Sequence, residues 1–360
     1  MKILLIGEYS NLHWTLAKGL RSLGHKVVVA SDGCGWQNNQ RDIDLTLNGN
    51  SFLDKIRYRI DILRNIKRFK GFDVVQIISP VFLKLNTNDI LRLFQYLKKH
   101  NRKVFLGAFG TDFYYTKACL ERKFRYSDFM VPGMKENLPD DNIKWTKSPL
   151  KDLNETLAEK CDGIISCLYE YKVSYENIWG YKSEYIPLPI NTDEIKPTAV
   201  YDGKAKFFMG VQKLKSHLKG CDVMSEVLNE ICHKYKDICE FKMVESLPYA
   251  SYMEVMDGCN ILVDQLYSYS PGMNALLGMA KGMVTISGGE PEIYSILNET
   301  DNTPIVNPIP DRSDIYDKIL NLVENIESIE KIGKNSRKFV EQHHNYIDVA
   351  MKYIDFWRSR

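Results

Sequence analysis

Short, continuously apolar segments alternate with helix-periodic segments along most of this chain. The first example is the apolar run Lys2–Ile6, which is followed by a turn and then by Leu12, Leu16, Leu20 and Leu23 at helical spacing. Strands that are apolar on both faces belong to parallel sheets whose two faces are covered by helices. The pattern therefore predicts an α/β fold built on parallel sheets.

The alternation is interrupted once. Tyr185–Pro197 contains three prolines, has no periodicity and is predicted to be a linker. We expect two doubly wound, Rossmann-like domains at residues 1–188 and 189–340 that face each other across a cleft, and a C-terminal helix at 341–360 that packs back on the first domain. Ligands of such sheets bind beyond the carboxyl ends of the strands, so the cleft is the expected site.

The expected elements can be given by residue number. In the first half we expect strands at 2–6, 26–30, 73–78, 103–106 and 163–166, and helices at 12–23, 89–99 and 153–160. In the second half we expect strands at 206–209, 241–244, 260–263 and 284–286, helices at 222–235 and 274–281, and a largely helical tail over 315–360.

Composition excludes several classes of function. The 360 residues carry 48 basic and 46 acidic side chains, a net charge of +2, so no whole-protein field favours nucleic acid. The N-terminal apolar run is too short for a signal peptide, and no apolar stretch reaches the roughly 18 residues of a membrane span, so we expect a cytoplasmic protein. The eight cysteines are scattered and are expected to be reduced thiols, with no zinc site and no disulfide.

Familiar cofactor motifs are missing. The first turn, from Gly7 to His13, is not G-x-G-x-x-G, and the chain has no P-loop. Asp42-Ile-Asp44 has the form of a metal-binding D-x-D, but it lies in a strand-like run. We therefore expect neither a bound cofactor nor a metal.

The most informative stretch is Tyr269–Gly282, where a Pro-Gly loop directly precedes a helix of small and apolar residues. The N-terminus of a helix carries free N–H groups and a partial positive charge, which suits a phosphate. Ala275, Gly278 and Ala280 would let the helix pack close to a strand. A tightly packed turn without a ligand is the alternative interpretation.

Ordered short motifs make most of the chain resemble the GT-B glycosyltransferases, in particular the family-four-like group that uses sugar nucleotides. The motifs are, in chain order, Leu16–Val27, Asp73–Ser79, Gly110–Asp112, Ile186–Asn191, Phe208–Gly210, Lys219–Asp222, Gly272–Leu276, Met279–Gly282 and Ser287–Glu292.

The resemblance implies an enzyme that moves a sugar from a UDP- or GDP-linked donor to a hydroxyl of a glycan or lipid-linked glycan, with retention of configuration and without a metal. The first domain would bind the acceptor and the second the donor. Lys219, with the helix start at Gly272, Met273 and Asn274, would contact the donor pyrophosphate and stabilise the charge of the leaving diphosphate.

Five further residues are candidates for the site, each with a plainer alternative. Asp112 would orient the acceptor hydroxyl or accept its proton, or else cap a helix that begins at Phe113. Gly7 and His13 would reach the donor phosphates from the first turn, or belong to an ordinary helix start. Lys213 would be a second phosphate contact or a surface lysine. Glu292 would border the donor, and the helix dipole stabilises it whatever its role.

The chain departs from the family pattern at two positions in the donor helix. Tyr269 and Leu277 stand where the family carries two glutamates, and Phe109 stands where a histidine is usual. These departures keep two alternatives open: a binding or scaffold protein on the same fold, and a sugar-nucleotide epimerase.

A basic amphipathic helix is expected over residues 52–70. Phe52, Ile56, Ile60 and Leu63 follow helical spacing, and seven basic side chains face two acidic ones in this stretch. Such a helix can lie on an anionic membrane surface as a peripheral contact. The alternative is a helix that packs its apolar side on the core and exposes a solvated basic face.

Overall fold

The computed structural model describes residues 1–34, 38–129, 131, 143–212 and 216–360. The chain divides into two compact units. The first consists of Met1–Glu121, Pro139–Pro189 and Tyr346–Arg360, and the second of Arg122–Leu138 and Ile190–Asn345.

The first unit is built on a seven-stranded parallel sheet in the order β3-β2-β1-β4-β5-β6-β7. Its strands are β1 (Lys2–Ile6), β2 (Lys26–Ser31), β3 (Ile43–Asp44), β4 (Val74–Ile77), β5 (Lys103–Ala108), β6 (Gly163–Ser166) and β7 (Ser183–Tyr185). The strand order reverses between β1 and β4, which makes this point the topological switch of a doubly wound sheet.

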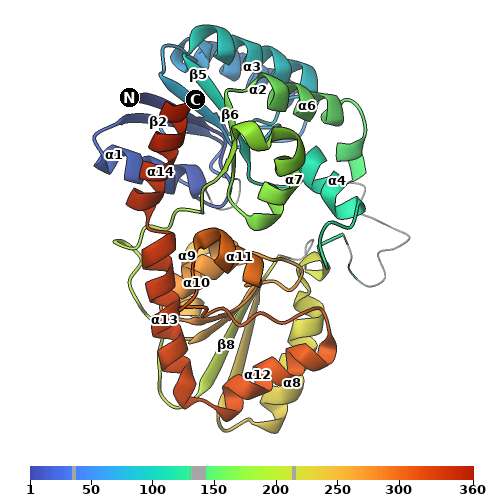
Figure 1. Cartoon of the computed structure of the whole chain (residues 1–360), viewed down its shortest axis with the longest axis vertical. Helices are drawn as coiled ribbons and strands as arrows, with labels where there is room; N and C mark the ends of the chain where they lie inside the picture. The colour runs from blue at the N-terminus through green and yellow to red at the C-terminus, as the bar shows by residue number, and fades with distance from the viewer. Residues whose placement is uncertain (35–37, 130, 132–142, 213–215) are drawn as a thin grey trace. The chain divides into compact units, whose positions relative to one another are not determined.

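Helices cover this sheet, and two of them lie side by side although they are far apart in sequence: α1 and α14 (Figure 1). A Cβ atom on Gly19 of α1 would lie 2.3 Å from the carbonyl oxygen of Tyr346 in α14, so a glycine is needed at this crossing. The helices of the unit are α1 (Leu12–Ser22), α2 (Phe52–Asn65), α3 (Thr87–His100), α4 (Phe113–Leu120), α6 (Leu150–Lys160), α7 (Tyr169–Trp179) and α14 (Tyr346–Ser359).

The second unit is built on a four-stranded parallel sheet in the order β11-β10-β8-β9, with its switch between β8 and β10. Its strands are β8 (Ala205–Val211), β9 (Cys239–Glu245), β10 (Ile261–Val263) and β11 (Val284–Ile286). Its helices are α8 (Cys221–Lys234), α9 (Tyr249–Asp257), α10 (Met273–Ala280), α11 (Pro291–Leu297), α12 (Arg312–Glu324) and α13 (Glu327–His343). The predicted α/β class with two parallel sheets is confirmed.

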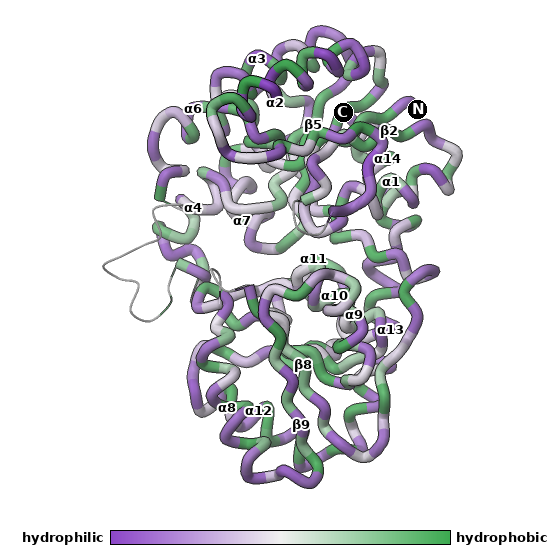
Figure 2. The backbone as a smooth tube through the Cα atoms, turned by 180° about the vertical axis from the view of Figure 1, so that it is seen from behind, coloured by the Kyte–Doolittle hydropathy of each residue, from purple (hydrophilic) through white to green (hydrophobic). Residues whose placement is uncertain are grey.

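Helices cover both faces of this second sheet. α8 packs against α12 on one face, and α10 packs against α13 on the other (Figure 1). Phe207 and Phe208, neighbours in β8, are both fully buried because successive side chains of a strand point to opposite faces. Figure 2 shows apolar residues along β8 accordingly.

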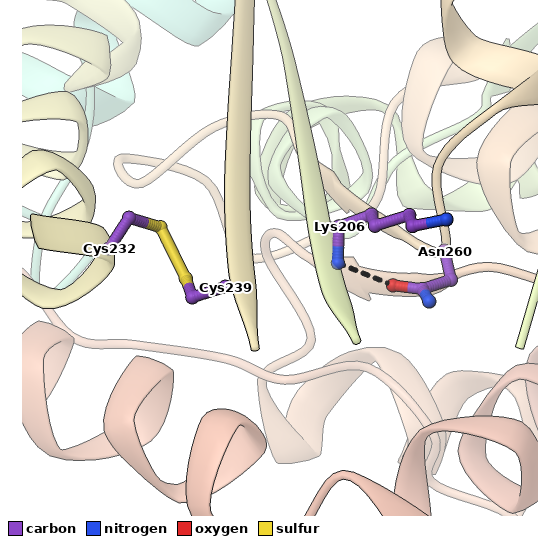
Figure 3. Close-up of a disulfide and its surroundings, with 4 residues drawn as sticks. All are labelled: Lys206, Cys232, Cys239 and Asn260. Carbon is purple, nitrogen blue, oxygen red and sulfur yellow. Dashed lines mark hydrogen bonds between the residues drawn. A yellow bond between two sulfur atoms is a disulfide. The ribbon is translucent and has the colours of Figure 1, made fainter. Parts of the chain in front are cut away.

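The cysteine prediction is wrong at one pair. Cys232, near the end of α8, and Cys239, at the start of β9, form a disulfide across a Cα–Cα distance of 5.0 Å (Figure 3). The seven-residue separation spans a helix-to-strand turn, which brings the two side chains together; spacing in sequence alone did not reveal this. The other six cysteines are thiols that form no disulfide.

A short segment between α4 and α6 belongs to the second unit although it precedes the linker. We call Arg122–Phe129 the crossover segment. Soon after it, Val131 is buried in the hydrophobic core of the second unit, among residues such as Phe207 and Ile286.

Candidate phosphate-binding site

The second unit gathers polar side chains where β8 and β10 diverge. β8 leads into a 3-10 turn, His217–Lys219, and then into Gly220, whose φ of 70° lies in the left-handed region. A Cβ on Gly220 would lie 2.7 Å from the Cβ of Leu266, so the two loops touch. The N–H of Leu266 also donates to the carbonyl oxygen of Lys219 at 2.9 Å. These contacts fix Lys219 beside the end of β10.

One carboxylate connects Lys219 to the start of α10. Oδ1 of Asp264 lies 3.3 Å from Nζ of Lys219 and accepts a hydrogen bond from Nδ2 of Asn274 at 3.0 Å. Asp264 is only 3% exposed, and its Oδ2 is buried with no hydrogen-bond partner among the described residues. The structure thus brings together Lys219 and Asn274, two residues that the sequence predicted for one site.

The start of α10 has the character of an anion site. Its N-cap is Gly272, which brings no side-chain cap, and no acidic residue lies in the first turn. The N–H groups at Met273 and Asn274 therefore lie at the positive end of a helix whose N-cap residue supplies no side-chain acceptor. At Gly278, a Cβ would lie 2.5 Å from Cδ2 of Leu262, so the predicted close packing of this helix on a strand is confirmed.

Tyr252 of α9 belongs to the same network, and the sequence analysis missed it. Its hydroxyl donates to Oδ1 of Asn274 at 2.7 Å, and its ring packs on Phe208 at 5.0 Å between centroids. A Cβ on Gly210 would lie 2.3 Å from the Tyr252 ring. A glycine inside a strand marks such a close approach, so Gly210 was the available signal.

Glu292 lies in the first turn of α11, as expected, and pairs with a residue that the sequence did not suggest. Arg125 of the crossover segment contacts both oxygens of Glu292, and the longer hydrogen bond is 3.0 Å. This hydrogen bonding holds the pKa of Glu292 below its usual value.

The first turn of the first unit does not have the geometry of a phosphate site. Gly7 has a φ of 85°, and a Cβ there would lie 2.3 Å from Ile78, so packing explains the glycine. Nδ1 of His13 donates to the carbonyl oxygen of Gly7 at 2.8 Å, and burial lowers the His13 pKa to about 4. Nε2 therefore carries no proton near neutral pH and cannot donate to a phosphate. This geometry argues against His13 as a phosphate contact.

Asp112 has the structural role that was its alternative prediction, the capping of a helix. It is the N-cap of α4, where Oδ1 accepts from the Tyr115 N–H at 3.0 Å and Oδ2 accepts from the Tyr175 hydroxyl at 2.6 Å. The side chain is 1% exposed, and burial raises its pKa to about 6. Both oxygens are thus used inside the fold, and a role as base stays a prediction.

Two other sequence candidates can be placed briefly. Lys213 lies outside the described residues. In the D-x-D triplet, Asp42 binds Arg21 at 2.6 Å and Asp44 binds Arg41 at 2.9 Å, so both carboxylates are engaged in ion pairs. Within the described ranges, no three His, Cys, Asp or Glu side chains are grouped so that they could hold a metal ion.

The basic helix forms over Phe52–Asn65, shorter than the expected 52–70, and a 3-10 helix follows at Ile66–Phe69. Of the expected apolar stripe, Ile56 is partly buried, whereas Phe52, Ile60 and Leu63 are exposed. α2 begins at a capping box made by Ser51 and Asp54 and contacts its unit through the buried Tyr58 and Ile62. Four other apolar side chains of the helix are between 43% and 77% exposed: Phe52, Leu53, Ile60 and Leu63. At 3.6 residues per turn these four occupy an arc of about 100°, roughly opposite the buried side.

Basic residues border this arc on both sides. By the same helical geometry, Lys55 and Arg59 flank one edge, and Arg57 and Arg64 flank the other. We call the four exposed apolar residues with these flanking cations the α2 stripe. None of the helices in the described part of the chain is long and apolar enough to cross a membrane.

Comparison with known proteins gives solved structures only. Neither a family model nor a curated protein matches the chain. The chain is similar to a sucrose-phosphate synthase from Thermosynechococcus elongatus, with 12% identity, a TM-score of 0.65, and 100% of this chain and 99% of that chain covered. It is similar to Anabaena HepE, solved with UDP and glucose, with 10% identity, a TM-score of 0.64 and full coverage of both chains.

A third similar structure is WaaG, described as a glycosyltransferase involved in lipopolysaccharide biosynthesis. Here the identity is 10%, the TM-score is 0.61, and 99% of each chain is covered. Structural matches at such low sequence identity establish the fold alone. The chain therefore has the GT-B fold that its ordered motifs indicated.

Proposed function

We propose that this GT-B chain is a glycosyltransferase that moves a hexose from a nucleoside-diphosphate sugar to a hydroxyl acceptor. One observation carries the proposal: Lys219 and the first turn of α10 converge on Asp264 at the switch point of the second sheet. When a glycosidic bond to a diphosphate breaks, negative charge develops on the leaving group. An ammonium group and helix-terminal amides fixed at that place stabilise this charge in the transition state.

Two finer features belong to the proposal. Lys219 supplies the cation that a metal supplies in other diphosphate sites, so the reaction needs no metal. The leaving phosphate takes the proton of the acceptor hydroxyl, and configuration is retained. The similar HepE structures hold UDP, UDP with glucose, and UDP-glucose, which supports a nucleotide-sugar donor for the fold.

The direct test is release of nucleotide from a panel of UDP- and GDP-sugars, with and without hydroxyl acceptors and in the presence of a chelator. We expect acceptor-dependent release from at least one donor that persists with the chelator. Conversion of the donor to an isomer without an acceptor would indicate an epimerase instead. A protein that binds no donor and releases no nucleotide would be a scaffold on the GT-B fold.

We further propose that the acceptor is a glycan or lipid-linked glycan reached at an anionic membrane surface through the α2 stripe. Exposed apolar side chains bordered by cations are the features of a helix that lies in the plane of a membrane interface. The stretch 52–70 has seven basic and two acidic residues, which gives a local charge of +5. The whole chain carries +2, so the residues outside this stretch together carry a net charge of −3.

Vesicle sedimentation tests this contact. The wild type should co-sediment with vesicles of phosphatidylcholine plus phosphatidylglycerol, and less with phosphatidylcholine alone. Replacing Phe52 and Leu63 by serine should abolish binding. The matched control is Ile178→Ser, which removes an apolar side chain that is 48% exposed on α7 of the same unit. Equal binding of all three proteins would contradict the membrane contact.

A further inference from the structure

The crossover segment is attached to the second unit through Tyr269. The backbone N–H of Arg125 donates to the Tyr269 hydroxyl at 2.7 Å, and the Arg125 guanidinium lies 4.7 Å from the centre of the same ring. The rings of Phe124 and Tyr126 contact Tyr269 at centroid distances of 5.7 and 5.2 Å. Tyr269 thus fixes Arg125 at the carboxyl edge of the second sheet.

The Arg125 guanidinium lies between two carboxylates. Nη2 donates to Oε2 of Glu290 at 2.7 Å, and the guanidinium binds both oxygens of Glu292. Arg125 is 55% exposed, whereas the Glu290 side chain is only 7% exposed. One guanidinium and two carboxylates leave this cluster with a net negative charge.

Glu290 is held from three sides. Besides Arg125, Nδ2 of Asn307 donates to its Oε1 at 2.8 Å, and the Tyr126 hydroxyl donates to the same oxygen. A carboxylate can accept about four hydrogen bonds. Three donors from the described residues therefore fix Glu290 and leave it able to accept one more, such as a hydroxyl group.

The loop between β11 and α11, which carries Glu290, borders the loop between β10 and α10. The N–H of Glu290 donates to the carbonyl oxygen of Tyr269 at 3.1 Å. A Cβ on Gly288 would lie 2.3 Å from the carbonyl oxygen of Ser268, so the two loops touch. β10 and β11 are neighbours in the sheet, and neighbouring strands are about 4.8 Å apart. We therefore expect a sugar attached to a diphosphate at the start of α10 to reach this cluster.

We propose that Glu290 accepts hydrogen bonds from the hydroxyls of the donor sugar, and that Arg125 is a positioning residue that keeps Glu290 oriented. This inference rests on the proposed function. It also accounts for Tyr269, because the carboxylate that the family carries at that position is supplied here from the next loop. The net negative charge of the cluster selects a neutral, hydroxyl-rich hexose over an anionic sugar.

The experiment measures what the sugar adds to nucleotide binding. Calorimetry gives dissociation constants for UDP and UDP-glucose and for GDP and GDP-mannose. In each pair we call the dissociation constant of the bare nucleotide divided by that of the nucleotide sugar the sugar increment. Glu290→Gln should reduce the increment about 10-fold and leave the affinity for the bare nucleotide unchanged, because a hydrogen bond to a charged group is lost. Arg125→Ala should reduce it in the same direction, with partial rescue by Arg125→Lys.

Matched controls exist in the same unit. Arg312→Ala removes a guanidinium that is 58% exposed and paired with Glu230, and Glu240→Gln removes a carboxylate at the opposite edge of the sheet. Neither should change the increment. Should Glu290→Gln fail to fold, Tyr126→Phe removes one donor to Glu290 and should still lower the increment.

The outcomes separate this inference from the proposed function. A wild type that binds neither nucleotide overturns both. Nucleotide binding with no sugar increment, or with an increment that Glu290→Gln and Tyr126→Phe leave unchanged, overturns the role of Glu290 and leaves the phosphate site standing. An increment that changes equally in the Arg312→Ala control contradicts the positioning role of Arg125.

Discussion

The ammonium group of Lys219 lies 3.3 Å from Oδ1 of Asp264, the same oxygen that accepts the amide of Asn274. The cation proposed for the diphosphate is therefore paired with a buried carboxylate. Asp264 is 3% exposed and the Lys219 side chain is 35% exposed, so Lys219 can turn toward a ligand while Asp264 stays in place. Binding of a diphosphate must compete with this pair.

Lys219→Ala should weaken binding of UDP or GDP about 10- to 100-fold, because a charge-assisted contact to phosphate is lost. It should also lower the free energy of unfolding by about 1 kcal/mol, since the buried Asp264 loses its cationic partner and keeps only Asn274, while water partly screens the exposed lysine. Calorimetry and urea unfolding measure the two effects separately.

A double variant separates binding from folding. Lys219→Ala with Asp264→Asn should recover stability, because no buried charge is left unpaired, but should not recover nucleotide affinity. Lys204→Ala, which removes a lysine paired with Glu240 in the same unit, is the matched control and should bind normally. Recovery of affinity in the double variant would mean that Lys219 acts only through the fold.

The sequence predicted those parts of the fold that depend on local patterns. Runs such as Lys2–Ile6 and Val284–Ile286 form strands of parallel sheets. Their side chains point to both faces of the sheet, and helices that cover both faces bury them. The approach of Lys219 to the helix after Gly272 could also be predicted, because parallel strands place their following loops at one edge of the sheet.

Other contacts could not be predicted, because no local pattern encodes them. Arg125 and Tyr269 are 144 residues apart in sequence and belong to no common motif. The period of α2 fits a buried and an exposed apolar stripe equally well, and only packing through Tyr58 and Ile62 decides between them.

Asp112→Asn tests a pH dependence whose sign follows from burial. Burial raises the Asp112 pKa from 3.8 to about 6, so between these pH values the folded state binds the proton more strongly than the unfolded state. The free energy of unfolding should therefore fall as pH rises through this window, by roughly 3 kcal/mol at about 1.4 kcal/mol per pH unit. The asparagine variant should lack this slope and should be at least as stable at neutral pH. Urea unfolding at several pH values measures it.

The same variant tests whether Asp112 serves only as the N-cap of α4 or also as a catalytic base. An asparagine still accepts from the Tyr115 N–H and can donate to the Tyr175 hydroxyl, so α4 keeps its start. Since both Asp112 oxygens are used inside the fold, we expect nucleotide release to stay within a few-fold of the wild type. A loss of about 100-fold or more with unchanged stability would instead identify Asp112 as the base.

Gly19→Ala should destabilise the first unit although alanine favours helices. The intrinsic gain from glycine to alanine is about 1 kcal/mol. Overpacking costs about 1–3 kcal/mol, and here the added methyl group would lie 2.3 Å from a backbone oxygen of Tyr346, which cannot rotate away. A net loss of about 1 kcal/mol should appear in urea unfolding. Gly180→Ala, whose Cβ would meet nothing nearer than 3.8 Å, should be neutral or slightly stabilising. Stabilisation by Gly19→Ala would contradict the close crossing of α1 and α14.

Reduction of the Cys232–Cys239 disulfide should destabilise the second unit by about 2 kcal/mol, because a short loop in the unfolded chain is no longer closed. Thermal unfolding with and without dithiothreitol measures the effect, and a variant with serine at both positions should not respond to the reductant. Thiol titration of the denatured, unreduced protein should detect six reactive thiols among the eight cysteines. Eight reactive thiols in that sample would show that the bond does not form, and the reductant should then leave the wild type unchanged as well.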